Sequence, residues 1–264
     1  MHPILFILIL SLVCAAALPV IIGKLWLILA FFLGFAVLFA LLFWIILAVF
    51  SAVVKHGKIY DEPSKLYLWL LNAAYAFVCG GARVKIKSEG LEKIPEEPFL
   101  LVSNHVSQLD NMVQSLVLRP RKIAFIAKAE LFKVPIVRGM ITRCCYISVD
   151  RKSSKNDRSS IASAEDYINR GVMSIGVYPE GHRGKNGQVQ KFHAGSFKIA
   201  VDTGCPIVVS AVIGTENVHK RFPFRSTEVR FDIIETINPS GRKSVELSEE
   251  VHEKIKNYVE RFKK

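Results

Sequence analysis

Hydrophobic residues fill the first 54 positions of this 264-residue chain almost without interruption. Lys24, which follows Gly23, is the only charged residue between Met1 and Val54. It separates two apolar runs, at positions 3–22 and 25–54, and about 20 apolar residues are enough to cross a hydrocarbon core of about 30 Å. We therefore predict a transmembrane helical hairpin over residues 1–54, with its turn at Gly23-Lys24.

Two other interpretations of this segment stay open. Ala15-Ala16-Ala17 resembles a signal-peptide cleavage site, although the positively charged region that precedes such a site is missing. The hairpin can also enter the bilayer and return to the same face without crossing it. If it does cross, Lys55 and Lys58 directly after the second run place the rest of the chain in the cytoplasm, because basic flanks stay on that side.

Residues 55–82 link the hairpin to the remainder of the chain. Within them, positions 65–78 are apolar and rich in aromatic residues, and they end at Gly80-Gly81. Fourteen residues are too few to span a bilayer. The pattern predicts an interfacial helix that lies on the membrane surface, and an ordinary core helix of the following domain fits it equally well.

From residue 83 the hydrophobic period changes to that of alternating strands and helices. Polar and apolar positions alternate at 83–87, which predicts a half-buried strand, and later short apolar runs predict buried strands. The expected strands cover 83–87, 99–103, 123–126, 145–149, 172–178, 207–212 and 229–234, and the expected helices cover 107–118, 157–169, 194–203 and 247–262. This order predicts an α/β domain over residues 83–264, with a largely parallel central sheet flanked by helices.

The charge of the chain is concentrated after the hairpin. Positions 55–264 hold 34 of the 35 basic residues and all 23 acidic residues, a net charge of +11. A basic domain tethered to a bilayer is expected to contact anionic lipid headgroups, although a basic excess can also serve solubility alone. We expect no nucleic-acid partner, because the sequence has no helix-turn-helix, zinc-finger or aromatic RNA-binding signature.

The five cysteines predict reduced thiols. Their number is odd, Cys14 lies in the apolar hairpin, and Cys144 and Cys145 are adjacent, a spacing that disulfide geometry disfavours. No C-x-x-C or cysteine–histidine ligand spacing is present, so we expect no metal site. The domain is predicted to lie in the reducing cytosol.

The first candidate for chemistry is Asn104-His105, with Asp110 five residues after the histidine. It follows the predicted strand 99–103, where an α/β sheet places its ligands. A histidine can take a proton near neutral pH, and a carboxylate on its other ring nitrogen fixes the required tautomer. The spacing alone is common by chance, and a surface histidine beside a helix-capping aspartate gives the same letters.

The second candidate is Pro179-Glu180-Gly181-His182-Arg183, which follows the predicted strand 172–178. Gly181 permits a tight turn with positive φ. Arg183 offers a planar fork that can hold a phosphate with two hydrogen bonds, and Glu180 can orient Arg183 or bond a substrate hydroxyl. Arg151, after the predicted strand 145–149, is either a second phosphate ligand or a solvated arginine.

As a set, these motifs resemble those of the glycerolipid acyltransferase family, and most closely the 1-acyl-sn-glycerol-3-phosphate acyltransferases. The matching positions are Asn104, His105 and Asp110; Lys128, Pro135, Gly139, Asp150 and Arg151; Pro179, Glu180, Gly181 and Arg183; Phe192, Gly195 and Phe197; and Pro206. They occur in order between about residues 84 and 215. The chain departs from the family pattern at His182, Gly184, Cys145 and Val209, and none of these changes removes a group expected to be catalytic.

The resemblance implies a glycerolphosphate acyltransferase-like fold and an acyl transfer from a thioester, acyl-CoA or acyl-ACP, to the sn-2 hydroxyl of lysophosphatidic acid. His105 and Asp110 are the implied catalytic residues. The implied substrate-binding residues are Asn104, Lys128, Arg151, Glu180, Gly181, Arg183 and Gly195. Backbone amides near His105 or Gly195 are expected to stabilise the oxyanion, and no metal or cofactor is implied.

The resemblance also implies that the product is phosphatidic acid for phospholipid biosynthesis. The partners it implies are the phospholipid bilayer, lysophosphatidic acid and the acyl carrier, and the short layout suggests a bacterial inner membrane with the catalytic domain facing the cytoplasm. Two alternatives stay open: an acyltransferase for another lysolipid acceptor, and a non-catalytic membrane lipid-binding protein on the same fold.

Overall fold

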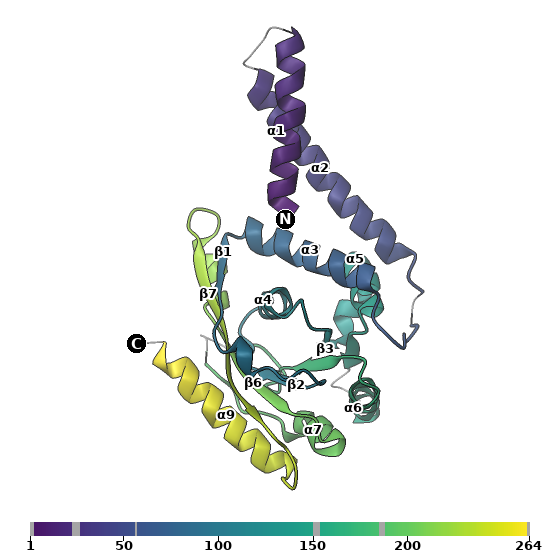
Figure 1. Cartoon of the computed structure of the whole chain (residues 1–264), viewed down its shortest axis with the longest axis vertical. Coiled ribbons are helices and arrows are strands. Elements are labelled where there is room, and N and C mark those ends of the chain that lie inside the picture. Colours follow the sequence, from purple (N-terminus) through teal and green to yellow (C-terminus); the bar gives the residue numbers. More distant parts are fainter. Residues whose placement is uncertain (1–2, 23–26, 56, 150–153, 185–187, 263–264) are drawn as a thin grey trace.

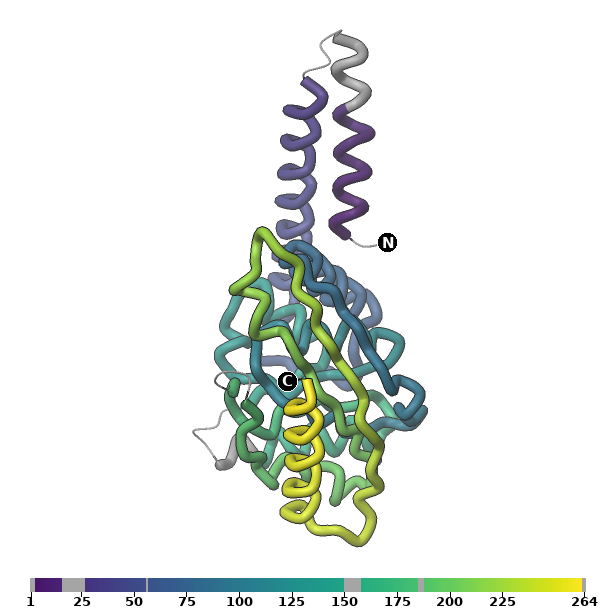
Figure 2. The backbone as a smooth tube through the Cα atoms, turned by 90° about the vertical axis from the view of Figure 1, so that its left-hand side faces the viewer, coloured from purple at the N-terminus to yellow at the C-terminus, as the bar shows by residue number. Residues whose placement is uncertain are grey.

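An apolar helical hairpin projects from one end of an α/β domain (Figures 1 and 2). The computed structural model describes residues 3–22, 27–55, 57–149, 154–184 and 188–262. Helices α1 (Pro3–Ile22) and α2 (Leu27–Ala52) pack against each other. The length and apolar character of α2 suit a membrane span. The predicted turn at Gly23-Lys24 lies outside the described residues, and a full crossing by both helices stays a prediction.

The central sheet confirms the predicted α/β class. In the described part of the chain it has seven strands in the order β1-β7-β6-β2-β5-β3-β4. Strands β6, β2, β5, β3 and β4 are mutually parallel, whereas β7 runs antiparallel to β6 and parallel to β1. The strands are β1 (Val84–Lys87), β2 (Leu100–Ser103), β3 (Ile123–Lys128), β4 (Ile147–Val149), β5 (Ser174–Val177), β6 (Ile207–Ile213) and β7 (Thr227–Ile237).

Burial along the strands follows the hydrophobic pattern of the sequence. β2 and β5 are buried at every position, as expected of central parallel strands covered on both faces. β1 lies at an edge of the sheet and alternates between half-buried and exposed residues. Each strand lies within a few residues of its predicted range.

Helices cover both faces of the sheet (Figure 1). One layer contains α3, α4 and α5, and the other contains α6, α7 and α9. Their bounds are α3 (Lys65–Gly81), α4 (Asp110–Val117), α5 (Pro135–Arg143), α6 (Ser154–Asn169), α7 (Lys198–Thr203), α8 (Val218–Arg221) and α9 (Ser244–Arg261). The sequence analysis missed α5, because its nine residues are too few for an apolar period, although Pro135 at its start is a typical first helical residue.

All four predicted helices differ from the observed ones at their starts, and α6 and α9 each begin three residues earlier than predicted. The helix expected from Ser107 begins at Asp110, because the Asp110 carboxylate accepts the backbone N–H groups of Val106 and Ser107 and holds them outside the helix. The helix expected from residue 194 begins with a 3-10 turn at Ala194–Phe197, and α7 follows it.

Helix α3 shows features of both predicted alternatives, the interfacial helix and the core helix. Tyr67, Leu70 and Tyr75 on one face are buried in the core. On the other face, Leu66 is 48% and Trp69 66% exposed, which is compatible with contact to lipid. The predicted position at the membrane interface, and the division of the chain at residues 54 and 82, stay predictions.

A close crossing of α2 and α5 fixes the hairpin to the domain. The Ser51 hydroxyl donates to the Pro135 carbonyl at 2.5 Å and accepts the Gly139 amide at 3.0 Å. A Cβ at Gly139 would lie 2.2 Å from the Ser51 carbonyl oxygen, so only glycine permits this approach. The hairpin is therefore oriented by direct backbone packing.

Four of the cysteines are buried, as predicted: Cys79, Cys144, Cys145 and Cys205. Their reduced state stays a prediction. Desolvation raises the pKa of the Cys79 thiol to about 11. These thiols stay neutral and pack as small apolar groups.

Candidate active site

The parallel strands bring the sequence motifs to one edge of the sheet. β2 pairs with β5, β5 with β3, and β3 with β4, all in parallel, so their carboxyl ends lie on the same side. The segment containing His105 leaves β2, the segment containing Glu180 leaves β5, and Lys128 ends β3. Ligands of open α/β sheets bind at this edge.

His105 and Asp110 form a hydrogen-bonded pair. Nδ1 of His105 lies 2.8 Å from Oδ2 of Asp110. The Asp110 side chain is completely buried, whereas the His105 side chain is 23% exposed. An ionised carboxylate only accepts hydrogen bonds, so Nδ1 carries the proton and the lone pair of Nε2 is free to take another.

The Asp110 carboxylate is held by three further donors. Oδ2 accepts the backbone N–H groups of Val106 at 2.7 Å and Ser107 at 2.8 Å. Oδ1 accepts the Thr215 hydroxyl at 2.5 Å. These bonds stabilise the ionised carboxylate and fix its plane, and the plane in turn sets the orientation of the imidazole.

Tyr178 supports the other side of the histidine. The two rings stack with centroids 4.3 Å apart, and Tyr178 stacks in turn on Phe125 at 5.8 Å. The Tyr178 hydroxyl donates to Oε1 of Gln114, and desolvation followed by the nearby Asp110 charge raises its pKa well above the usual value. Tyr178 is therefore a neutral support for the imidazole ring.

Sequence reasoning missed Tyr178 and Thr215 as parts of this site. Tyr178 directly precedes Pro179, so its adjacency to a motif was an available signal. Thr215 lies 105 residues after Asp110, and only the pairing of β6 beside β2 brings them together.

Glu180 links the two motif loops. Its carboxylate is fully buried and accepts the His105 amide at 2.7 Å and the Gln190 amide at 2.9 Å. The amide of Gly184 donates to the His105 carbonyl at 2.7 Å, so the loops are joined twice. Desolvation raises the pKa of Glu180 to about 7, against the lowering effect of its two amide donors.

This geometry corrects the role predicted for Glu180. The described residues contain no hydrogen bond between Glu180 and Arg183, and both carboxylate oxygens are engaged by backbone amides. Glu180 is a positioning residue for the His105 loop. Its burial leaves no exposed surface for the predicted contact with substrate.

Arg183 extends from the same loop into solvent. Gly181 has φ +76°, as predicted, and the turn closes with its amide donating to the Tyr178 carbonyl at 3.1 Å. Within the described ranges, the exposed Arg183 guanidinium has no hydrogen bond or ion pair. It is one residue from Gly184, whose amide donates to the His105 carbonyl, so Arg183 starts beside the His105 loop.

The structure does not support substrate contact by Asn104. This side chain is fully buried, and it donates to the Val212 carbonyl at 2.9 Å and accepts the Val212 amide at 2.8 Å. Both hydrogen bonds join the Asn104 side chain to the backbone of β6, just beyond the end of β2. It anchors the His105 loop to the sheet.

The remaining predicted residues are Lys128, Gly195, Asp150 and Arg151. Lys128 and Gly195 are exposed, and no hydrogen bond or ring contact in the described residues joins either to His105. Asp150 and Arg151 lie outside the described residues. Among the amides near His105, those of His105, Val106 and Ser107 already donate to Glu180 or Asp110, so these three are not free for an oxyanion. An oxyanion contact at the Gly195 turn stays a prediction.

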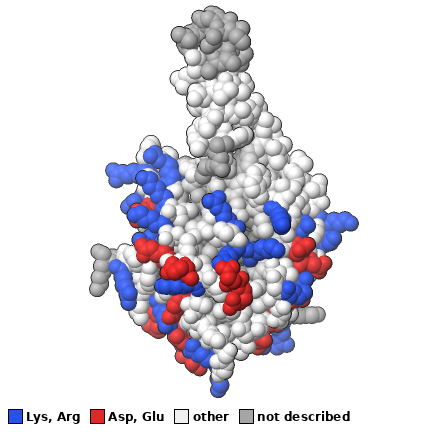
Figure 3. Space-filling view, in the orientation of Figure 1, with Lys and Arg blue, Asp and Glu red and all other residues white. Residues whose placement is uncertain are grey.

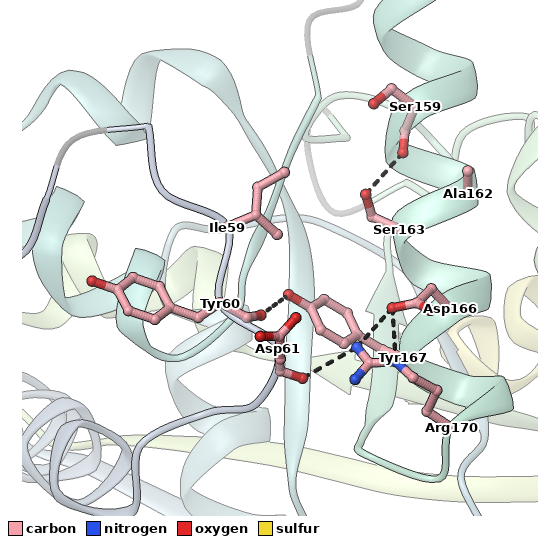
Figure 4. A pocket seen from close by; sticks show the side chains of 9 residues that line it. All are labelled: Ile59, Tyr60, Asp61, Ser159, Ala162, Ser163, Asp166, Tyr167 and Arg170. Atoms are coloured by element: carbon pink, nitrogen blue, oxygen red, sulfur yellow. Dashed lines mark hydrogen bonds and ion pairs between the residues drawn. The ribbon is translucent and has the colours of Figure 1, made fainter.

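The cavity in Figure 4 is lined by neither His105 nor Asp110. It measures about 280 Å³ and is formed between residues 59–61 and α6. The Tyr167 hydroxyl donates to the Tyr60 carbonyl at 2.6 Å, and Arg170 donates to the Asp61 carbonyl and to Asp166. These polar groups satisfy one another, so they fasten the linker after the hairpin to α6. In the part of the chain described, no three His, Cys, Asp or Glu side chains are grouped to hold a metal ion.

The fold and site define a class: an α/β domain with a histidine–aspartate pair and a free arginine at the carboxyl edge of its parallel strands. Residues 85–213, about half of the chain, match the model of the acyltransferase family. A crystal structure titled as the 1-acyl-sn-glycerophosphate acyltransferase PlsC of Thermotoga maritima superimposes with a TM-score of 0.59 and 26% identity. That match covers 83% of this chain and 95% of the Thermotoga chain.

Curated relatives carry related names. Human 1-acyl-sn-glycerol-3-phosphate acyltransferase beta is 29% identical over 193 residues, which are 72% of this chain and 67% of the human protein. A chloroplastic 1-acyl-sn-glycerol-3-phosphate acyltransferase of Arabidopsis thaliana is 29% identical over 153 residues, which are 57% of this chain. The match spans only 40% of the length of the Arabidopsis protein.

Proposed function

We propose that this protein is a membrane-bound 1-acylglycerol-3-phosphate acyltransferase. It transfers a fatty acyl group from a thioester, acyl-CoA or acyl-ACP, to the sn-2 hydroxyl of lysophosphatidic acid, and phosphatidic acid is the product. The observation that carries the proposal is the 2.8 Å His105–Asp110 pair, with the exposed Arg183 on the adjoining loop, at the carboxyl edge of a sheet that matches the acyltransferase family model. The names of the relatives support the choice of acceptor.

In the proposed reaction, Nε2 of His105 removes the proton from the acceptor hydroxyl while that oxygen attacks the thioester carbonyl carbon. The imidazolium formed is stabilised by the Asp110 carboxylate. The tetrahedral intermediate collapses with cleavage of the carbon–sulfur bond, and the departing thiolate takes the proton back from His105. Atoms and charges balance without an acyl-enzyme intermediate.

The acceptor phosphate is assigned to Arg183, because its guanidinium is exposed and unpaired among the described residues and starts beside the His105 loop. A bidentate guanidinium–phosphate contact fixes both distance and orientation. Lys128 at the end of β3 is a proposed further contact. Arg151, which lies outside the described residues, is another. Gly181 contributes the turn that presents Arg183, and Gly195 is kept as a proposed backbone contact.

The hairpin supports a membrane location, where the lysolipid and the product both reside. The proposed location is a bacterial inner membrane with the α/β domain in the cytoplasm, on the basis of Lys55 and Lys58 after the second apolar run. We propose no metal or cofactor.

The test is an acyl-transfer assay with purified full-length protein in detergent. Labelled oleoyl-CoA and oleoyl-ACP are offered in separate reactions with lysophosphatidic acid, and the position of the new ester is determined by cleavage with an sn-2-specific phospholipase. Labelled phosphatidic acid with the label at sn-2 is expected. Transfer only to an acceptor without a phosphomonoester would reassign the substrate, and binding of lysolipids without transfer would favour the lipid-binding alternative.

A further inference from the structure

The turn between α8 and β7 presents two phenylalanines to solvent. Phe222 is 52% exposed and Phe224 is 86% exposed. No other large hydrophobic side chain in the described part of the chain is more exposed than Phe224. Single exposed apolar residues are ordinary, but two exposed aromatic rings on one short turn form an apolar patch of the kind that marks an interaction site.

The turn holds these rings outward. The Arg83 guanidinium donates to the carbonyl oxygens of Pro223 at 3.3 Å and Phe224 at 3.2 Å. The Phe222 amide donates to Val218 and the Arg225 amide to Arg221, each at 2.9 Å. These bonds fix the backbone of the turn from both ends.

Basic side chains surround the phenylalanines. Lys220, Arg221 and Arg225 flank them in sequence, Arg83 lies beneath them, and positions 217–227 contain no Asp or Glu. None of these four cations forms an ion pair with another residue that the structure describes. In Figure 3, blue side chains gather at this upper edge of the domain, just below the uncharged hairpin.

The turn lies level with the base of the hairpin. A Cβ at Gly81 would lie 4.0 Å from Ile4 in the first turn of α1, and Gly81 is two residues before Arg83. Both ribbon views place the tip before β7 at the height where α1 begins (Figures 1 and 2). A bilayer that receives the hairpin therefore meets this turn at its surface.

We propose that residues 220–225 form a second membrane contact, in which Phe222 and Phe224 enter the boundary between headgroups and acyl chains of an anionic bilayer. The surrounding cations bind lipid phosphates there. Charge complementarity and continuity with the apolar hairpin favour a bilayer over a protein partner. The contact fixes the tilt of the domain on the bilayer. It begins five residues after Thr215, which donates a hydrogen bond to Asp110. The inference does not depend on the proposed reaction.

The experiment places an environment-sensitive fluorophore, NBD, on a Phe224→Cys variant of the full-length protein in a Cys14→Ser background. The other native cysteines are buried and do not compete for the label. The matched control is Val245→Cys, another exposed apolar position at 56%, on the start of α9 at the end of the domain away from the hairpin. Each protein is reconstituted into phosphatidylcholine vesicles with or without phosphatidylglycerol, and quenching by a doxyl-labelled lipid is measured.

The expected result is a blue-shifted emission at position 224 that loses most of its intensity to the lipid quencher in anionic vesicles, with no change at position 245. Arg221→Gln together with Arg225→Gln should reduce the quenching gained from phosphatidylglycerol. The hairpin holds every variant in the vesicle, so the comparison isolates the turn. A water-like, unquenched signal at position 224 would overturn the proposal. A blue shift without lipid quenching would also overturn it, and would assign the patch to a contact between proteins.

Discussion

Replacement of Asp110 by asparagine separates the two functions of this carboxylate. The amides of Val106 and Ser107 both point at Oδ2, so the amide oxygen of an asparagine would take that position. The Thr215 hydroxyl can accept from the asparagine Nδ2. The histidine should therefore keep its Nδ1–H tautomer, and only the negative charge opposite the forming imidazolium is lost.

The size of this loss follows from Coulomb's law. At a charge separation of about 4 Å and an effective dielectric constant of about 20, the attraction is about 4 kcal/mol. Because four donors already share the charge of Asp110, part of this is screened, and we expect kcat to fall by about 10²- to 10³-fold. The kcat of Asp110→Ala should fall further, since this change also leaves the amides of Val106 and Ser107 unpaired and removes the partner that orients the imidazole.

The assay is the steady-state rate of acyl transfer at saturating thioester and lysophosphatidic acid, with folding verified by circular dichroism. Asp202→Asn is the matched control, because it makes the same change on a surface carboxylate paired with Lys198, and its kcat should equal that of the wild type. A folded Asp110→Asn protein with the kcat of the wild type would refute the reasoning that the dyad stabilises a charged histidine.

Three further predictions concern the anion contact, the hairpin and the buried carboxyl. Arg183→Ala should raise the KM for lysophosphatidic acid at least about tenfold, for a lost charge-assisted contact of about 1.5–3 kcal/mol. Arg119→Ala, two residues beyond the end of α4, should leave this KM unchanged. Equal KM values for the two variants in steady-state kinetics would exclude the phosphate contact. Gly139→Val should lower the thermal unfolding temperature, because its Cβ would lie 2.2 Å from the backbone of α2. Gly81→Ala should leave this temperature unchanged, because the nearest atom to its Cβ would lie 4.0 Å away. Equal unfolding temperatures for the two variants would contradict the close crossing of α2 and α5. Burial raises the pKa of Glu180 from 4.5 to about 7, so folding favours its protonated form, and the stability this provides below about pH 4.5 is lost as the pH rises through about 7. Relative to Glu180→Gln, the wild type should therefore lose up to about 3 kcal/mol of stability across this window in denaturant titrations. A stability difference that is independent of pH would contradict the raised pKa of Glu180.

Much of the fold could be predicted from the sequence, because burial patterns are local. β2 and β5 are short uninterrupted apolar runs, β1 alternates, and α9 has apolar residues at helical spacing, so each was recognised in place. α5 was missed because nine residues carry little period. The antiparallel direction of β7 was not predicted, since strand direction depends on pairing with β6 and not on the residues of β7 alone.

In the site, too, only the features that depend on nearby residues could be predicted from the sequence. His105 and Asp110 are five residues apart, so their pairing could be predicted from spacing, and the positive φ of Gly181 followed from its place in the turn. The burial of Asn104 and Glu180 could not be predicted, because it depends on Val212 and Gln190, which approach only through the tertiary fold. Thr215 carries no local signal for the same reason.

The most direct test of the central claim is the rate of acyl transfer to lysophosphatidic acid by a folded His105→Ala protein beside the wild type, in the same detergent and with the same thioester. The account predicts labelled phosphatidic acid from the wild type and a rate at background from the variant, because the variant lacks the imidazole that removes the proton from the acceptor hydroxyl. A folded His105→Ala protein that forms phosphatidic acid at the wild-type rate would contradict the assignment of His105 as the base.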